Sequence, residues 1–405
     1  MKERIFICLL ITALFICFMS CENPIIKTWW EEQENTNGKI GTGSGVDNSK
    51  IVKADPIVDW PVGLKGIFGQ KLQTVTMPCT HMDTTSGTFT WTKPNTLLGN
   101  SRKQSHNLTF TPDDTSHYNI VTKNVDITVI ALNMARIPGG TFLMGTPPND
   151  PWYLPEEGPQ HQVTLDGFYM SEYMVTQELY EVVMNNNPSE HTSPAKGENK
   201  TPEQFPVDSV RWYDTLIFCN KLSVMMGLTP AYRIPAFNNS TDPLDWGKAP
   251  VNSTDPNLPL WNAVEIVPGS NGYRLPTEAQ WEYACRAGTT TAYYTGNVFD
   301  YNTTGWCSGT NLGTDITVHK VGMLPANPWG LYDMHGNLLE WCWDWYSDSY
   351  SGASQINPTG PSSGTNRVIR GGWYLSLHDE LRSACRKEFD ACLRRWFNGF
   401  RIVLP

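Results

Sequence analysis

The chain has 405 residues, enough for two or three domains of ordinary size, each with its own core. Only 17% of the residues are charged, 12% are aromatic, and the formal net charge is −10. This balance argues against a nucleic-acid partner held by overall charge, and the many glycines, prolines, tryptophans and tyrosines favour a loop-rich, exported protein over a helical cytosolic one.

The first 20 residues have the pattern of a signal peptide. Lys2 and Arg4 supply positive charge, and the apolar run at residues 5–18 is too short for an ordinary membrane span. Ser20 directly precedes Cys21, an arrangement that resembles the cleavage site of bacterial lipoproteins. We therefore expect a lipid on Cys21 to anchor the exported chain to the cell envelope, at the outer membrane surface. The alternative is a plain signal peptide in which Cys21 is incidental.

Ten cysteines are present, and seven of them follow Cys21. These seven are Cys79, Cys219, Cys285, Cys307, Cys342, Cys385 and Cys392. An odd number at irregular spacing indicates neither a disulfide framework nor a zinc site. A bridge or two is open to an exported protein, and the sequence does not assign one.

Two regions separate the signal peptide from the largest part of the chain. Residues 21–50 are polar and glycine-rich, so we expect a flexible tether there. Residues 51–132 alternate apolar and polar side chains, as half-buried strands do. The alternation is clearest at Val125, Ile127 and Val129. Because the end of this region also resembles the closing strands of bacterial immunoglobulin-like repeats, we expect a small all-β immunoglobulin-like domain that acts as a spacer.

Residues 135–405 contain three predicted helices among many loops. Thr176 is the expected N-cap of a helix that runs towards Met184, with Val175 placed to pack onto Tyr180. A second helix is expected over residues 212–226, because a glycine follows it directly.

The third predicted helix begins with a capping box. Thr277 and Gln280 have the required spacing, and Gly288 is the expected C-cap. Residues 232–269 are rich in asparagine, proline and aspartate, which predicts long loops.

A series of short motifs runs through the whole of residues 135–405. They include IPGGTFLMG at residues 137–145, YRLPTEAQWEYA at 273–284, PWGLYDMHGNLLEW at 328–341, RGG at 370–372 and GFR at 399–401. In this order they resemble the formylglycine-generating enzymes, also called sulfatase-modifying factors. The resemblance implies an α+β fold, a variant of the C-type lectin fold, with small twisted sheets, two main helices and much irregular chain.

Several charged residues of these motifs stand among apolar neighbours. Arg274, Glu278 and Glu282 are examples, and Arg370 and Arg401 lie beside or near glycines, where the backbone is crowded. Charged groups in such surroundings need buried partners, so we expect most of these residues to hold the scaffold together.

The resemblance also implies a copper ion bound by two cysteines, five positions apart, a few residues beyond Gly371-Gly372. Thiolates suit Cu(I) because both are soft. Ser376 stands at the first of these positions and no cysteine stands at the second, whereas Cys385 and Cys392 come later and are seven positions apart. We therefore expect that the chain is not an enzyme and has no catalytic residues.

A calcium site of the family has a partial counterpart. The resemblance assigns its oxygen ligands to Asp333, Gly336, Leu338 and Glu340, and carboxylates with backbone carbonyls are the ligands that Ca²⁺ prefers. Ca²⁺ is therefore the one candidate cofactor. A hydrogen-bonded turn without a metal is the equal alternative.

The segment 367–405 interleaves scaffold-like residues with residues of every chemical type. This pattern resembles the variable region of proteins diversified by retroelements, in which one face of a lectin-like domain binds the ligand. The resemblance makes the following residues candidate ligand contacts: Trp373, Tyr374, Ser376, His378, Asp379, Glu380, Cys385, Lys387, Phe389, Asp390, Cys392, Arg395, Trp396 and Phe397. Tryptophan, tyrosine and arginine are common in binding hot spots, although aromatic residues of the core give the same composition.

The leading hypothesis is a surface lipoprotein that binds a protein or another macromolecular ligand on another cell, without nucleic acid. One alternative is an oxidase of the formylglycine-generating type, or another enzyme acting on exported substrates. The other is a structural envelope lipoprotein, for which changes in residues 373–397 would alter stability alone.

Overall fold

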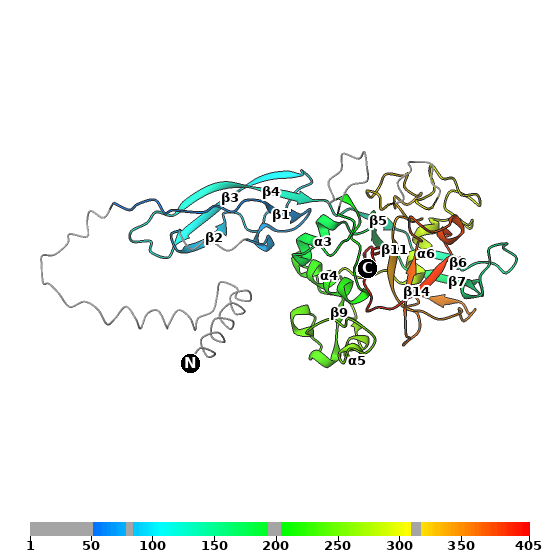
Figure 1. Cartoon of the computed structure of the whole chain (residues 1–405). Coiled ribbons are helices and arrows are strands. Elements are labelled where there is room, and N and C mark those ends of the chain that lie inside the picture. Colours follow the sequence, from blue (N-terminus) through cyan, green and yellow to red (C-terminus); the bar gives the residue numbers. More distant parts are fainter. Residues whose placement is uncertain (1–51, 78–83, 193–203, 309–316) are drawn as a thin grey trace, which may run out of the picture. The chain divides into compact units, whose positions relative to one another are not determined.

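The computed structural model describes residues 52–77, 84–192, 204–308 and 317–405 (Figure 1). The predicted signal peptide, the tether and Cys21 lie outside the described residues. The described residues divide into two compact units. One holds those up to Val62 and those within Met77–Thr92 and Asn107–Val125, and the other holds those within Gly63–Thr76, Lys93–His106 and Asp126–Pro405. The domain boundary expected at residues 132–135 stays a prediction. Within the described ranges, no helix combines the length and apolarity needed to cross a membrane.

The described part of residues 52–132 is built from strands. They form one sheet in the order β1-β4-β3-β2: β1 (Leu64–Ile67), β2 (Gly87–Trp91), β3 (Lys103–Pro112) and β4 (Val121–Ile130). Strand β2 pairs antiparallel with β3, whereas β1 pairs parallel with β4. The predicted alternation is confirmed, because Val125, Ile127 and Val129 are all buried on β4. Only a 3₁₀ turn, η3 (Leu72–Thr74), interrupts the described strands, so the expectation of an all-β region is confirmed.

The motif at residues 137–145 begins at the end of β5 (Met134–Ile137) and contains β6 (Gly140–Met144). A Cβ on Gly139, between them, would lie 2.9 Å from the backbone nitrogen of Gly167, so the close approach requires glycine. The two strands enter separate three-stranded sheets, ordered β16-β8-β5 and β12-β7-β6. Their other members are β7 (His161–Leu165), β8 (Phe168–Ser171), β12 (Gln355–Ile356) and β16 (Val403–Leu404).

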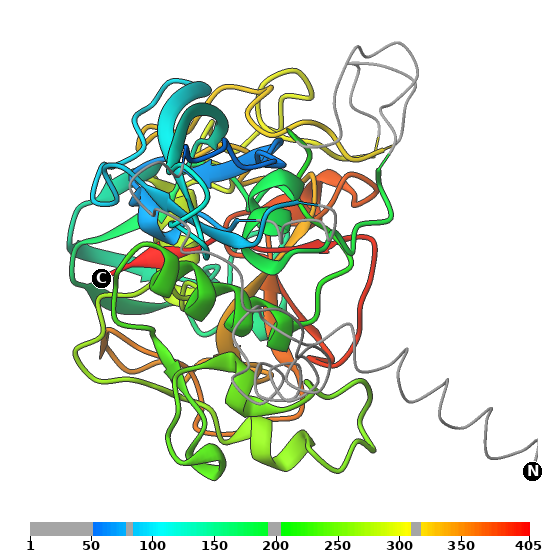
Figure 2. The ribbon, with the colours of Figure 1, turned by 90° about the vertical axis from the view of Figure 1, so that its left-hand side faces the viewer.

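Helices α3 (Gln177–Met184) and α4 (Trp212–Met225) pack against each other (Figures 1 and 2). As predicted, Thr176 caps α3, since its hydroxyl accepts a hydrogen bond from the backbone N–H of Leu179 at 3.3 Å. Val175 and Tyr180 are buried in the same apolar cluster, as the expected staple requires.

Helix α6 (Glu278–Arg286) has the predicted capping box of Thr277 and Gln280. The left-handed residue that ends it is Ala287 and not Gly288, which follows with a positive φ of its own. The long loops expected at residues 232–269 contain only short elements: β9 (Tyr232–Arg233), η6 (Pro235–Phe237), η7 (Pro243–Trp246), α5 (Leu258–Asn262) and β10 (Glu265–Ile266).

A four-stranded sheet lies between α4 and α6. Its order is β14-β13-β11-β15, formed by β11 (Leu339–Trp345), β13 (Arg367–Arg370), β14 (Arg386–Phe389) and β15 (Asn398–Gly399). Side chains alternate between its faces. Trp341 and Ile369 pack in the apolar cluster of α4, whereas Cys342 and Val368 pack in that of α6. The sheet is therefore covered on both faces.

Two loops carry most of the predicted ligand contacts. Residues 371–385 join β13 to β14, and residues 390–397 join β14 to β15. The first loop leaves β13 through Gly371 and Gly372, both with positive φ. A Cβ on Gly372 would lie 2.6 Å from Leu381, so this turn also requires glycine.

Candidate functional site

Buried ion pairs anchor both ends of the first loop. Arg370, at the end of β13, donates to Glu278 at 3.0 Å and to Glu282 at 2.9 Å. Arg386, at the start of β14, donates to both oxygens of Glu278 at 2.6 and 2.8 Å. Burial alone would raise the pKa of Glu278, but the charges of Arg386 and Arg370 hold it below its usual range. The expected buried partners of these glutamates are therefore confirmed.

Two further arginines tie the C-terminal segment to distant parts of the chain. Arg382 makes a bidentate pair with Glu157, with both nitrogen–oxygen distances at 2.8 Å. Arg401 makes a similar pair with Glu340 at 2.7 and 2.8 Å. All four side chains are buried, so the segment starts, turns and ends at fixed points.

Five rings of the two loops and of β14 gather into one cluster, which we call the aromatic patch: Trp373, Tyr374, Phe389, Trp396 and Phe397. Trp373 lies at its centre, with its ring centroid 5.0 Å from that of Trp396 and 5.1 Å from that of Phe397. Tyr374 is buried and the other four rings are half-buried. Rings at these distances stabilise one another and leave edges for a partner.

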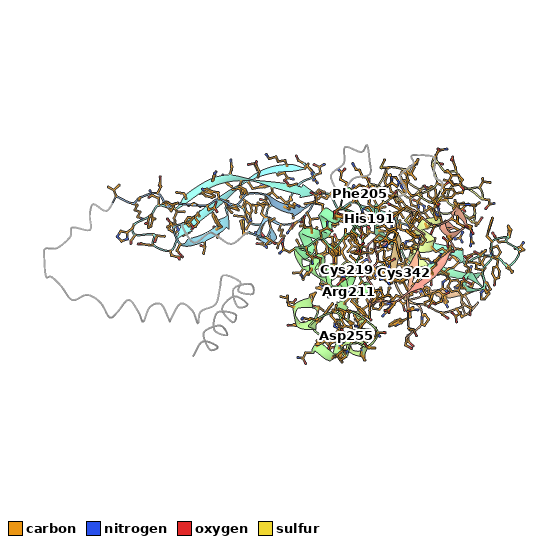
Figure 3. All side chains as sticks on the ribbon, viewed as in Figure 1. His191, Phe205, Arg211, Cys219, Asp255 and Cys342 are labelled. Atoms are coloured by element: carbon orange, nitrogen blue, oxygen red, sulfur yellow. The ribbon has the colours of Figure 1, made fainter. Side chains whose placement is uncertain are left out.

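His191, which is labelled with Phe205 in Figure 3, holds the buried member of the patch. Its Nδ1 lies 3.0 Å from a carboxylate oxygen of Asp208, and its Nε2 lies 3.1 Å from the hydroxyl of Tyr374. Burial, together with the charge of Asp208, raises the pKa of Tyr374 to about 12. The chain of Asp208, His191 and Tyr374 therefore fixes one edge of the aromatic patch to the loop that follows α3.

The charged residues of the first loop gather elsewhere, around a cavity of about 310 Å³ that we call the charged cavity. Asp379, Glu380, Cys385 and Lys387 line one side of it, and residues 151–156 line the other. His378 lies at its rim, with its ring centroid 6.1 Å from that of Trp152. Nine of the fourteen predicted contacts therefore belong to one of two structures: five to the aromatic patch and four to the charged cavity.

Four of the predicted ligand contacts have buried side chains: Tyr374, Ser376, Cys385 and Cys392. Asp390 is half-buried and accepts a hydrogen bond from the backbone N–H of Cys392 at 2.8 Å. Arg395 is exposed. The structure thus offers ten of the fourteen predicted contacts, in whole or in part, to a partner.

Sequence reasoning missed two residues that complete these structures. His191 lies in the loop after α3, and Trp152 follows an asparagine, aspartate and proline run. Trp152 is 49% exposed, and a large aromatic residue in such a polar loop was the one available signal. Nothing in the sequence places His191 beside Tyr374, 183 positions later.

The side chains of the predicted calcium site do not fit a calcium ion. Both oxygens of Glu340 accept from Arg401, and one also accepts from Trp281 at 2.8 Å. Asp333 accepts from the backbone N–H of Gly322 at 2.8 Å, and burial raises its pKa to about 6. The guanidinium of Arg401 takes the position at Glu340 that a calcium ion would need. The alternative of a hydrogen-bonded turn therefore describes Asp333, Gly336, Leu338 and Glu340 better.

Comparison with known proteins identifies the fold of this site. Residues 127–405 match the family described as the sulfatase-modifying factor enzyme 1-like domain. The chain belongs to this family. The predictions of the family and of its α+β lectin-like fold are therefore confirmed.

Similar proteins share different parts of their length with this chain. The chain is 34% identical over 256 residues to the chaperone protein LppX of Paenibacillus barcinonensis, covering 60% of this chain and 81% of the relative. It is 29% identical over 263 residues to the formylglycine-generating enzyme of Bos taurus, covering 60% and 66%. The structure of Treponema denticola variable protein 1 is similar at a TM-score of 0.59 and 32% identity, over 75% of this chain and 99% of that one.

The copper-binding positions of the sulfatase-modifying family are changed in this chain. Ser376 and Leu381 stand at the two positions, and both are buried. Cys385 and Cys392 lie on opposite ends of β14, a strand of four residues that spans about 13 Å. Burial raises the pKa of both thiols to about 12. These residues do not fit a copper ion held by two thiolates.

Proposed function

We propose that this chain is a non-catalytic member of the family that binds a protein on another cell through the aromatic patch, while a lipid on Cys21 anchors it to the outer membrane surface. The observation that carries the proposal is the aromatic patch on a fixed frame. The frame consists of the sheet β14-β13-β11-β15 and of five buried arginines: Arg367, Arg370, Arg382, Arg386 and Arg401. Four half-buried rings stand between buried ion pairs, and aromatic side chains held in place in this way are typical of binding hot spots.

The likeness to a Treponema variable protein supports the same proposal, because that chain is matched over almost its whole length. The two loops also suit diversification. They connect strands whose positions are set by Arg370, Arg386 and their glutamate partners, so a change in an exposed or half-buried loop side chain leaves these ion pairs intact.

The binding test uses the fluorescently labelled mature chain and whole cells, host cells and neighbouring bacteria alike. Trp373→Ala with Trp396→Ala should reduce cell binding at least tenfold, because hot-spot aromatics contribute the largest share of binding energy. Leu244→Ala with Val251→Ala is the control, since it removes two exposed apolar side chains from residues 232–269, outside the aromatic patch. Equal binding by the two variants, at equal thermal stability, contradicts the proposal and favours a structural lipoprotein.

The enzyme alternative is tested separately with copper. Relatives of this chain include formylglycine-generating enzymes, so the purified protein should be titrated with Cu(I) and then incubated with a cysteine-containing sulfatase peptide and oxygen. We expect neither stoichiometric copper binding nor oxidation of the cysteine. Copper bound at one equivalent together with formylglycine in the peptide would reverse the conclusion.

A further inference from the structure

All three cations that line the charged cavity already have an ion-pair partner. Each is paired with a carboxylate: Arg382 with Glu157, Arg386 with Glu278 and Lys387 with Glu380. The remaining nitrogens of the arginines also have acceptors. Nε of Arg382 donates to the carbonyl of Asp379 at 2.8 Å, and Nη1 of Arg386 donates to the carbonyls of Glu156 and Ser347 at 3.0 and 2.6 Å.

Two carboxylates of the same cavity have no such partner. Among the described residues, no hydrogen bond or ion pair ends on the carboxylate oxygens of Glu156 or Asp379. Both side chains are half-buried on the walls of the cavity, one from each side. Carboxylates that are partly withdrawn from water attract a cation more strongly than exposed ones do. Among the described residues, the cavity therefore has two carboxylates without a counter-ion, whereas each of its three cations has one.

The rim of the cavity is aromatic and apolar. Trp152 is 49% exposed and Leu154 is 40% exposed, and both line the cavity. A guanidinium or ammonium group is attracted to the face of a tryptophan ring, and its aliphatic stem packs on apolar side chains. A volume of about 310 Å³ lies at the lower end of the range of small-molecule pockets, which suits one long side chain.

We infer that the charged cavity receives a basic side chain, an arginine or a lysine, of the protein that binds the aromatic patch. The inference rests on the proposed function for its partner. Glu156 and Asp379 bind the charge, Trp152 stacks on it, and Leu154 contacts the stem. A partner with an acidic or neutral side chain at this point leaves both carboxylates unpaired, so the cavity selects among partners as well as binding them.

The test measures binding of short peptides to the full chain by isothermal titration calorimetry. The probes are acetyl-Gly-Arg-Gly-amide and its citrulline counterpart, which has the same shape without the charge. We expect one site for the arginine peptide and at least tenfold weaker binding of the citrulline peptide. Glu156→Gln with Asp379→Asn should weaken arginine binding at least tenfold, because hydrogen bonds to charged groups are the strong ones.

A matched control separates this site from the general negative charge of the chain. Glu172→Gln with Asp348→Asn also removes two carboxylates, at positions outside the cavity, and should bind the arginine peptide as the unchanged protein does. Undetectable arginine binding, equal binding of the two peptides, or equal binding by the two variants each overturns the inference. If cells still bind through Trp373 and Trp396 in that case, the proposed function stands and only the basic side chain is excluded.

Discussion

Arginine and tryptophan have different surroundings in the frame and in the two loops: they are buried in the frame, and exposed or half-buried in the loops. In the frame, Arg370 is fully buried and donates to two glutamates and two backbone carbonyls. In the second loop, Arg395 is exposed, and the one acceptor that its side chain has among the described residues is the carbonyl of its neighbour Arg394. Tryptophan divides similarly: Trp341 of β11 is fully buried, whereas Trp396 is half-buried in the aromatic patch.

The difference shows where this fold tolerates change. Four frame arginines, Arg370, Arg382, Arg386 and Arg401, have charged partners that lie far away in the sequence. A substitution of any of them leaves a buried carboxylate with fewer partners. The half-buried rings Trp373, Trp396 and Phe397 of the loops contact one another and pack against apolar side chains, without a buried charge that a substitution would leave unpaired. Stability and binding are therefore assigned to different residues of one short segment, and the assignment can be tested residue by residue.

The largest effect is expected for Arg370→Met. Removing the guanidinium leaves Glu278 and Glu282 buried with fewer partners, which should lower the free energy of unfolding by about 5 kcal/mol. Urea denaturation followed by tryptophan fluorescence measures the change. Arg395→Met is the loop control and should alter stability by less than about 0.5 kcal/mol. Similar losses in the two variants would show that the frame and the loops are not energetically distinct.

The pH dependence of stability tests one residue of the frame, Asp344 on β11. Burial, with the nearby charge of Glu278, raises the pKa of Asp344 on β11 from 3.8 to about 7. A raised carboxyl pKa means that its contribution to stability is full below about pH 4 and is lost as the pH rises through 7. The asparagine of Asp344→Asn does not titrate. Between pH 4 and pH 8 the free energy of unfolding of this variant should therefore rise, relative to that of the unchanged protein, by on the order of 4 kcal/mol.

Urea denaturation across this pH range tests the Asp344 prediction. Asp348→Asn, which removes an exposed carboxylate four positions away, is its control and should follow the unchanged protein at every pH. Parallel curves for the unchanged protein and Asp344→Asn would mean that Asp344 is ionised in the folded state at neutral pH.

The sequence predicts the frame well, because helix caps follow from local sequence patterns and buried charges require partners of opposite charge. Thr176 and Thr277 cap their helices as their spacing requires. Glu278 and Glu282, placed among apolar residues, had to find buried cations, and both contact Arg370. The family motifs, taken in chain order, predicted which of these elements come first and which follow.

The loops are predicted less completely, because their side chains are sorted by contacts with distant residues. Tyr374 and Asp379 looked equivalent as candidate contacts, yet Tyr374 is buried against His191 and Asp379 lines the charged cavity opposite residues 151–156. Neither neighbour is close in the sequence. The proposed calcium ligands show the same limit, since Glu340 is matched to Arg401, 61 positions later.

The smallest effect is expected for Arg367, a frame arginine that lacks a carboxylate partner. Its guanidinium lies between the rings of Trp212 and Trp345, at 3.6 and 3.3 Å from their centroids, and burial lowers its pKa to about 9. Its Nε has no hydrogen-bond acceptor, so attraction to the rings is offset by the cost of burying the charge. Arg367→Met should therefore change the free energy of unfolding by about 1 kcal/mol or less, measured as for Arg370→Met. A loss as large as that of Arg370→Met would show that the rings alone stabilise a buried cation as strongly as two carboxylates do.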